Sequence, residues 1–167
     1  RLFAAVDMSV TDAVIAVWDS KYHYGYWRPI TAIRLADTDG NPDTDADPTW
    51  EPLFATPPYP EYVSGYTGVV GAMTGSISRI LGGGQVDLYI TSAPAGVTRH
   101  YVTASALNQD AIDGRMLLGI HFRTADVVGN NMGTQVADWG LDRARVHESF
   151  RCYVDRCGVR LEAASGG

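Results

Sequence analysis

Apolar side chains recur at helical spacing at the start of the chain and again in its second half. In the segment from Leu2 to Asp19, the positions that follow this spacing are Phe3, Val6, Val10, Val14, Val17 and Trp18. Aromatic residues then lead to Arg28-Pro29. Because proline fixes φ and is favoured in the first turn of a helix, we expect a second, short helix from Pro29 to Leu35.

Three further helices are predicted. Ser64 suits the N-cap of a helix of small residues from Thr67 to Leu81, and three consecutive glycines end that helix. Helix is expected again from about Ser105 to Gly119, and a last helix from Ala125 to Arg143. The apolar positions on one face of this last helix are Val128, Met132, Val136 and Trp139.

The segments between these helices are predicted to be irregular. The stretch 37–50 contains Asp-Gly, Asn-Pro and Asp-Pro, which mark successive turns. Its acidic residues, Asp43, Asp45 and Asp47, lack the glycine and terminal glutamate of an EF-hand loop, which favours a solvated loop over a calcium site. The segments 86–90 and 96–102 are predicted to be loops or short extended pieces.

The composition fits one ordinary globular domain with a real core. Of the 167 residues, 46% are hydrophobic and 19% are charged. We expect an all-α domain at 1–143 and a C-terminal tail at 144–167. Cys152 and Cys157 in this tail are interpreted as free thiols or an incidental bridge, because no further cysteine or histidine pair supports a zinc site.

Charge and hydropathy exclude two classes of partner. The net charge of −6 argues against nucleic acid, whose binding normally needs a basic face. Asp, Arg or Gly breaks the longest apolar stretches well before the roughly 20 residues that a membrane span needs. No membrane span is therefore expected, and the compartment stays open between the cytoplasm and the exterior.

Four residues far apart in the sequence are candidates for one anion site: Lys21, Arg28, Arg115 and His121. Arginine offers a rigid fork of donors to a tetrahedral oxyanion, and lysine offers a point charge. Neutral imidazole has a free lone pair, which can ligate a metal or bond to phosphorus. Each residue alone is better explained as a surface or packed side chain, so the hypothesis depends on the four together.

Ser64 and Gly65 add a second kind of donor to this hypothesis. A helix start offers backbone N–H groups, and the positive end of the helix dipole favours an anion there. The serine hydroxyl is equally well explained as a plain helix cap.

These residues resemble the pattern of the vanadium-dependent haloperoxidases and the type 2 phosphatidic acid phosphatases (PAP2), which share one helical fold and one anion site. The family pattern is Lys, six residues and Arg-Pro; then Pro-Ser-Gly-His; then Ser-Arg, five residues and His. Lys21 with Arg28-Pro29 matches the first block, and Arg115 with His121 matches the third at the right interval. The segments 21–34 and 119–123 look like the soluble bacterial haloperoxidase-related branch rather than the membrane lipid phosphatases.

The resemblance spans about residues 2–143 and implies an all-α helical bundle of the haloperoxidase/PAP2 type, the C-terminal half of a longer family member. It also implies roles. The side chains that would hold vanadate or phosphate oxygens are Lys21, Arg28 and Arg115. Ser64 and the Gly65 amide would add hydrogen bonds, and His121 would ligate vanadium or become phosphorylated.

The chain departs from the family pattern at several positions. Tyr66 stands where the family has its acid–base histidine, Val63 replaces the proline of that block, and Gly114 replaces the serine before Arg115. Tyrosine can donate a hydrogen bond, but with a pKa of about 10 it is a poor proton shuttle at neutral pH. General acid–base help is typically worth about 10²–10⁴-fold, so turnover should suffer more than anion binding.

A third group often orients the key histidine. The family's aspartate four residues past that histidine is absent, and Asp126, five residues past His121, is a catalytic candidate in its place. His23 and His100 are candidates for the missing acid–base, although no spacing supports either.

Three functions follow from this resemblance. The first is a vanadate-dependent haloperoxidase-like oxidoreductase, impaired by Tyr66, whose small-molecule partners are peroxide and halide. The second is a phosphomonoesterase that works through phospho-His121. The third is a non-catalytic oxyanion-binding or scaffold homologue. Because the chain starts directly in an apolar segment, we also expect either a homo-oligomer or association with an N-terminal half.

Overall fold

Helices make up most of the computed structural model, which describes residues 1–93 and 95–144. The helices are α1 (Leu2–Tyr24), α2 (Pro29–Arg34), the short 3₁₀ helix η1 (Ala36–Thr38), α3 (Gly65–Leu81), α4 (Ala104–Leu117) and α5 (Arg123–Ala144). Two strands, β1 (Gln85–Ser92) and β2 (Val97–Thr103), lie between α3 and α4. The predicted tail lies outside the described residues from 145 onward, as do Cys152 and Cys157, and the domain boundary at 143 stays a prediction.

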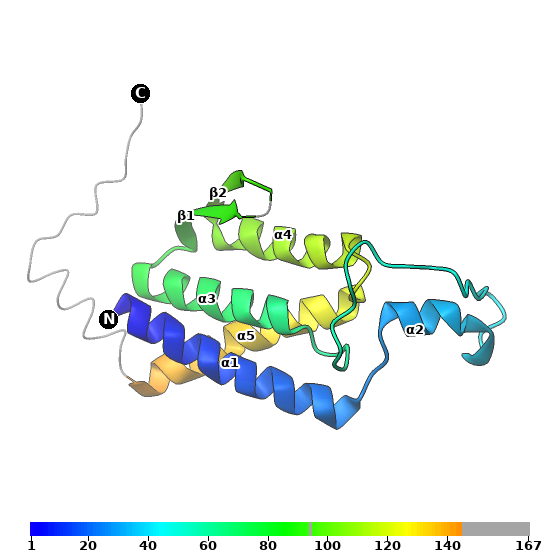
Figure 1. The fold of residues 1–167 in the computed structure, drawn as a ribbon. Helices are drawn as coiled ribbons and strands as arrows, with labels where there is room; N and C mark the ends of the chain where they lie inside the picture. The colour runs from blue at the N-terminus through cyan, green and yellow to red at the C-terminus, as the bar shows by residue number, and fades with distance from the viewer. Residues whose placement is uncertain (94, 145–167) are drawn as a thin grey trace, which may run out of the picture.

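Helix α3 occupies the middle of the bundle. It packs against α1, α5 and α4, and α1 also contacts α5 (Figure 1). The segment that carries α2 and η1 extends from the end of α1 as an arm and returns to the bundle just before α3 (Figure 1). The prediction of an all-α bundle is therefore confirmed, with a small hairpin added to it.

The buried side of α1 is a row of residues four apart: Ala5, Ser9, Ala13, Val17 and Lys21. Such i, i+4 rows form the ridges that pack between neighbouring helices, and small side chains let the helix axes approach. The larger apolar residues of α1 are less buried than their spacing suggests, and Phe3 is 82% exposed. Lys21 is thus buried because it continues the row that faces the bundle.

Helix α5 shows the same preference for small residues. Its fully buried apolar side chains are Ala125, Ala137 and Leu141, and Gly129 and Gly133 are buried in the same row. The predicted apolar face is wrong in part, because Trp139 is 58% exposed and Val128, Met132 and Val136 are only half-buried. Hydropathy predicted that the large apolar side chains would be buried, whereas the close contact between α3 and α5 buries the small ones.

Glycines allow this contact. A Cβ built on Gly133 would lie 2.8 Å from Ala72 N and closer still to Gly68 O. A Cβ on Gly129 would lie 2.5 Å from Ser64 O. The backbone of α5 therefore runs against the start of α3, where Ser64 lies.

The segment between α3 and α4 forms an antiparallel hairpin in which Leu88 pairs with Tyr101 and Ile90 with Arg99. The prediction of loops or short extended pieces there was correct for the extended backbone but did not foresee the pairing. Thr103 ends β2 and caps α4, since its side-chain oxygen accepts a hydrogen bond from Ala106 N at 3.2 Å.

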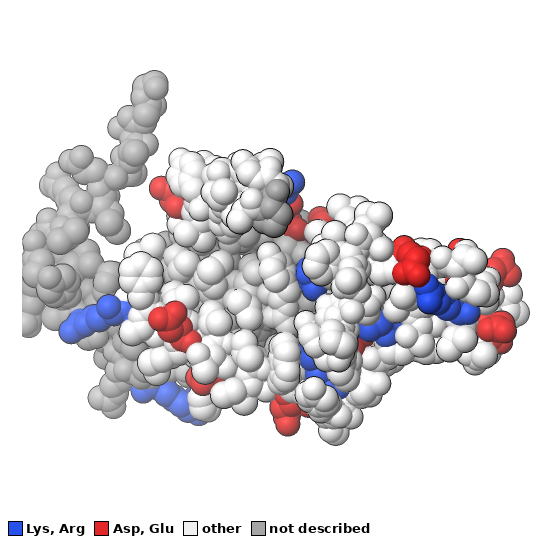
Figure 2. All heavy atoms as spheres, viewed as in Figure 1, with Lys and Arg blue, Asp and Glu red and all other residues white. Residues whose placement is uncertain are grey.

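Charged side chains are unevenly spread over the surface. In the space-filling view, acidic and basic side chains gather on the arm with α2, and the face over α3 is mostly uncharged (Figure 2). Among the described residues, none of the helices has the length and apolar character needed to cross a membrane.

Candidate active site

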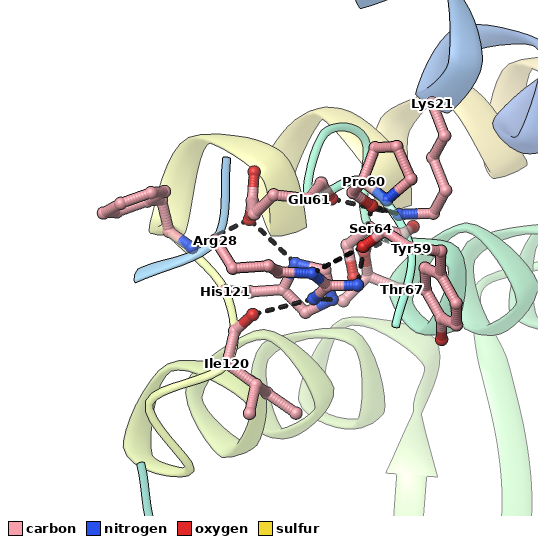
Figure 3. A network of polar contacts seen from close by, with 10 residues as sticks. Lys21, Arg28, Tyr59, Pro60, Glu61, Ser64, Thr67, Ile120 and His121 are labelled. Atoms are coloured by element: carbon pink, nitrogen blue, oxygen red, sulfur yellow. Dashed lines mark hydrogen bonds and ion pairs between the residues drawn. The ribbon is translucent and has the colours of Figure 1, made fainter. Parts of the chain in front are cut away.

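Polar side chains from several helices and the segments between them meet at one end of the bundle, and most of them are drawn in Figure 3. They come from the last turn of α1, the N-cap of α2, the segment before α3, the last turn of α4 and the connection from α4 into α5. In the same order these residues are Lys21, Arg28, Glu61 with Ser64, Arg115 and His121.

Lys21 is fully buried and tied to the segment before α3. Its Nζ donates to Pro60 O at 2.9 Å and to Glu61 O at 3.0 Å. A lysine ammonium has three hydrogens, so these two carbonyls leave one hydrogen for a further acceptor. Burial, together with the nearby Arg28 and Arg115 cations, lowers the pKa of Lys21 to about 8.

Arg28 links three segments of the chain. Its Nε donates to Tyr59 O at 3.0 Å, and its Nη1 donates to Ile120 O at 2.8 Å. The same Nη1 lies 3.2 Å from His121 Nε2. The guanidinium thus joins the start of α2 to the α4–α5 connection and lies directly beside the imidazole.

His121 is held between Arg28 and Glu61. Its Nδ1 lies 2.8 Å from Glu61 Oε1, which also accepts a hydrogen bond from Phe122 N at 2.9 Å. An arginine can only donate, so Arg28 faces an unprotonated Nε2, and the ring proton is on Nδ1, where the carboxylate accepts it. Burial lowers the pKa of His121, and Arg28 lowers it further, so the neutral form with a lone pair on Nε2 is favoured.

Glu61 was not among the site residues predicted from the sequence. Its carboxylate contacts Nδ1 of His121 and Arg28 lies at Nε2, so Asp126 does not take the orienting place expected of the family's aspartate. One signal was available: Glu61 is the only charged residue between Glu51 and Arg79. A single carboxylate inside a long uncharged segment is a candidate for a buried partner of a cation or imidazole.

Arg115 and Tyr66 lie together at the edge of the cluster. The Arg115 guanidinium carbon lies 5.1 Å from the centroid of the Tyr66 ring. Arg115 Nε is buried and has no hydrogen-bond partner among the described residues. Tyr66 is 52% exposed, so its phenol is open to solvent rather than buried with the other groups.

Ser64 and Asp126 form the buried floor of the cluster. Ser64 occupies the N-cap position of α3, but its side chain makes no capping hydrogen bond. Neither Ser64 Oγ nor the two Asp126 carboxyl oxygens have a hydrogen-bond partner in the described part of the chain. Burial and the Glu61 charge, opposed by the adjacent Ser64 hydroxyl, raise the pKa of Asp126 to about 7.

The two other candidate histidines lie elsewhere. His23 makes an edge contact with Tyr24 and is exposed. His100 lies in the hairpin, stacked on Tyr89 and 2.7 Å from Asp87 Oδ1. Neither lies in the cluster, where it could replace the acid–base histidine that the family has in place of Tyr66.

Comparison with known proteins identifies this arrangement. The family described as the VCPO second helical-bundle domain matches residues 1–149. The chain belongs to this vanadium chloroperoxidase family. The vanadium chloroperoxidase of Curvularia inaequalis is 32% identical to it over 170 residues, covering 74% of this chain and 27% of that protein.

Solved structures agree with the VCPO assignment. A bacterial vanadium-dependent iodoperoxidase matches with a TM-score of 0.70 and 28% identity, covering 84% of this chain and 32% of the other. A holo-type bacterial vanadium-dependent chloroperoxidase shares the fold with a TM-score of 0.68 and 22% identity, covering 90% of this chain and 35% of the other. The chain therefore spans about a third or less of the length of the VCPO relatives it matches.

The cluster suits the vanadate that these VCPO relatives are named for. Buried donors without partners among the described residues, Ser64 Oγ and Arg115 Nε, are what an oxyanion site needs before its anion binds. The free hydrogen of Lys21 adds a third donor, and the Nε2 lone pair of His121 is the ligand that a metal atom needs. These four groups would hold vanadate, or phosphate as its tetrahedral analogue.

Proposed function

We propose that this chain carries the vanadate site of a haloperoxidase-like oxidoreductase, which uses peroxide to oxidise halide. Bound vanadate would supply Lewis-acid chemistry that activates peroxide, so that halide is oxidised to a hypohalous species. The observation that supports the proposal best is the convergence of three cations on a neutral imidazole whose lone pair is free of a proton. Because the chain spans about a third or less of its relatives, this activity is proposed for the whole protein.

The cations have an electrostatic reason to bind an anion. Besides burial, the charges of Arg28 and Arg115 lower the pKa of Lys21, and the charge of Arg115 lowers the pKa of Arg28, which means that these cations repel one another in the anion-free state. An oxyanion among them would remove this repulsion and accept their remaining hydrogen bonds. Since these donors are buried, the interaction is weakened less by solvent than a surface ion pair would be.

Glu61 and His121 would fix the ligand geometry. The carboxylate holds the proton on Nδ1 and thereby directs the Nε2 lone pair at the cluster. A hydrogen-bonded carboxylate also makes an imidazole a more basic ligand.

The second candidate is an oxyanion-binding protein without turnover, and Tyr66 is the observation that favours it. An exposed phenol at the position of the acid–base histidine leaves anion binding intact but removes the group that would move a proton at neutral pH. A phosphomonoesterase that works through phospho-His121 would need the same missing proton transfer to its leaving group.

The test is halogenation of a phenolic dye by the full chain with vanadate, peroxide and bromide. We expect measurable turnover that is lost in His121→Ala and rises by about 10²–10⁴-fold in Tyr66→His, because imidazole restores acid–base help. Tyr66→Phe is the matched control, since it changes the side chain without adding a proton shuttle.

The other outcomes separate the alternatives. Vanadate binding with no turnover, even in Tyr66→His, would support the non-catalytic function. Vanadate-sensitive hydrolysis of p-nitrophenyl phosphate that depends on His121 would support the phosphomonoesterase. If vanadate and phosphate fail to bind at all, the oxyanion site itself is wrong.

A further inference from the structure

The proposed function does not explain how the buried polar atoms of both Ser64 and Asp126 are hydrogen-bonded. Both side chains are fully buried, at 0% exposure, and they lie beside each other at the start of α3 and in the first turn of α5. Yet Ser64 Oγ, Asp126 Oδ1 and Asp126 Oδ2 all lack a partner among the described residues. Buried polar atoms without partners are rare in folded proteins, so three at one place call for an explanation.

The number of hydrogens on Ser64 restricts the possible answers. A serine hydroxyl has one hydrogen to donate, and an ionised carboxylate can only accept. If Asp126 were ionised, it would take the Ser64 hydrogen, and Ser64 would turn its lone pairs toward the oxyanion. If Asp126 were a neutral acid, it could donate to Ser64 Oγ and leave the Ser64 hydrogen for the oxyanion.

The surroundings favour the neutral acid. Burial, helped by the nearby Glu61 carboxylate, raises the pKa of Asp126 to about 7. The Ser64 hydroxyl, Arg115 and Arg28 act in the opposite direction without cancelling this rise. The titratable and charged groups of the site on the elements packed around Asp126 are Lys21 on α1, Arg28 at α2, Glu61 before α3, Arg115 on α4 and His121 before α5.

We propose that Asp126 is a positioning residue that, in its neutral acid form, donates its hydrogen to Ser64 Oγ and so directs the Ser64 hydroxyl hydrogen at the bound oxyanion. The inference rests on the proposed function, which puts an oxyanion beside Ser64. It gives Asp126 a different part from the one suggested by its distance in sequence from His121, whose ring is oriented by Glu61.

A proton on Asp126 then controls the affinity for the anion. Below about pH 7 the acid is protonated, and Ser64 donates to the anion. As the pH rises through this value, the carboxylate takes the Ser64 hydrogen and adds a negative charge close to the anion. The affinity should therefore fall with rising pH in a step that needs both residues.

The experiment is calorimetric titration of the full chain with inorganic sulfate, whose charge is constant over the pH range used. We expect wild-type affinity to fall by roughly tenfold or more between about pH 6 and pH 8, the size of one hydrogen bond to a charged group. Asp126→Asn should lose much less, because the Asn amide donates to Ser64 Oγ at both pH values. Lys21 also loses charge near pH 8, but it does so in both proteins, so their ratio isolates Asp126.

Ser64→Ala separates hydrogen bonding from simple charge repulsion. In the Ser64→Ala background, Asp126→Asn should change the pH dependence much less, because only the charge of Asp126 is then left to act on the anion. If the difference persists in full without the serine hydroxyl, Asp126 acts through its charge alone and the inference is wrong. It is also wrong if wild type and Asp126→Asn bind sulfate with the same pH dependence.

A measurement on the wild type does not depend on the folding of any variant. Near pH 6 the infrared spectrum should contain the carbonyl stretch of a buried, protonated carboxylic acid, which shifts when sulfate binds and disappears as the pH rises past about 7. Absence of this band would overturn the inference while leaving sulfate binding, and hence the proposed site, in place. Failure of wild type to bind sulfate, phosphate or vanadate would overturn the site and the inference together.

Discussion

A single oxygen of Glu61 determines how His121 is presented. Glu61 Oε1 accepts from His121 Nδ1 and from Phe122 N, so it fixes both the ring proton and the first backbone amide after the histidine. The side chains of both members of the pair are 1% exposed. An imidazole held in this way keeps one tautomer, which leaves Nε2 available to a ligand.

Substitutions of Glu61 should therefore change how strongly His121 binds vanadate. Glu61→Leu removes the acceptor, and we expect it to weaken vanadate binding by about 10–100-fold. Glu61→Gln keeps an oxygen that can accept both hydrogen bonds but removes the charge, so its loss should be smaller. Calorimetric titration with vanadate measures the affinity, and nitrogen NMR of the imidazole reports the tautomer.

Glu51→Gln is the matched control, because Glu51 belongs to the same loop segment and pairs with Arg34 at the surface, where its side chain is 69% exposed. It should bind vanadate as the wild type does. Equal affinity in all the Glu61 variants, with an unchanged tautomer, would show that Glu61 does not orient His121.

At the level of elements, the site depends on how closely α5 approaches α3. Gly129 and Gly133 face α3 from one row of residues on α5. Ala125 lies one turn earlier in this row, and its carbonyl oxygen accepts a hydrogen bond from Ser64 N at 3.1 Å. Contact with α5, rather than a capping hydrogen bond of the Ser64 side chain, therefore positions the start of α3 with Ser64 and the Gly65 amide. Packing of α3 on α5 and geometry of the anion site are consequently coupled.

Gly133→Ala tests this coupling. The added methyl group would overlap the backbone of α3 near Ala72 N, and overpacking of this kind typically costs about 1–3 kcal/mol. We expect a lower free energy of unfolding in urea and weaker sulfate binding, because the helices must separate.

Gly114→Ala supplies the comparison within another helix. No atom of the described residues lies within 4 Å of a Cβ built at Gly114 in α4, so alanine should be neutral or stabilise the protein by about 0.5–1 kcal/mol through helix propensity. If Gly133→Ala is as well tolerated as Gly114→Ala, the close contact between α3 and α5 is not required.

At the scale of the whole molecule, an acidic protein has concentrated buried cations at one end of its bundle. The net charge is −6, yet Lys21, Arg28 and Arg115 meet where the ends of four elements converge. Burial lowers the pKa of Lys21 from 10.5 to about 8, so its charged form destabilises the anion-free fold below about pH 8. Binding of an oxyanion should reverse this penalty.

Sulfate should therefore raise the melting temperature, most strongly below pH 8. At 100 times its dissociation constant, a ligand stabilises the folded state by about 2.7 kcal/mol. Above about pH 8 the gain should shrink, because Lys21 loses its proton and one charge–charge interaction with the anion. Differential scanning calorimetry with and without sulfate measures this gain.

The control for this experiment is Lys21→Gln. It should bind sulfate more weakly and lose the part of the pH dependence that appears near pH 8. A gain in wild type that stays constant through pH 8 and above would mean that the Lys21 charge does not contribute to binding.

The helices and part of the site could be predicted from the sequence because they are local properties. Helical spacing, Pro29 and the glycines after Leu81 give five helices close to the observed bounds, although α1 continues to Tyr24. The interval from Lys21 to Arg28 and that from Arg115 to His121 each span one helix end, so the pairs could be recognised as blocks before any fold was known.

Contacts between distant segments were decided only by the tertiary structure. Glu61 meets His121 across 60 residues, and no local pattern records which carboxylate lies nearest an imidazole. Nor does hydropathy show that a glycine row, rather than Trp139 and its apolar neighbours, is the buried side of α5. Close packing depends on the shapes of both contacting surfaces, which one segment of sequence does not specify. This packing buries Lys21 and Asp126, and burial shifts their pKa values.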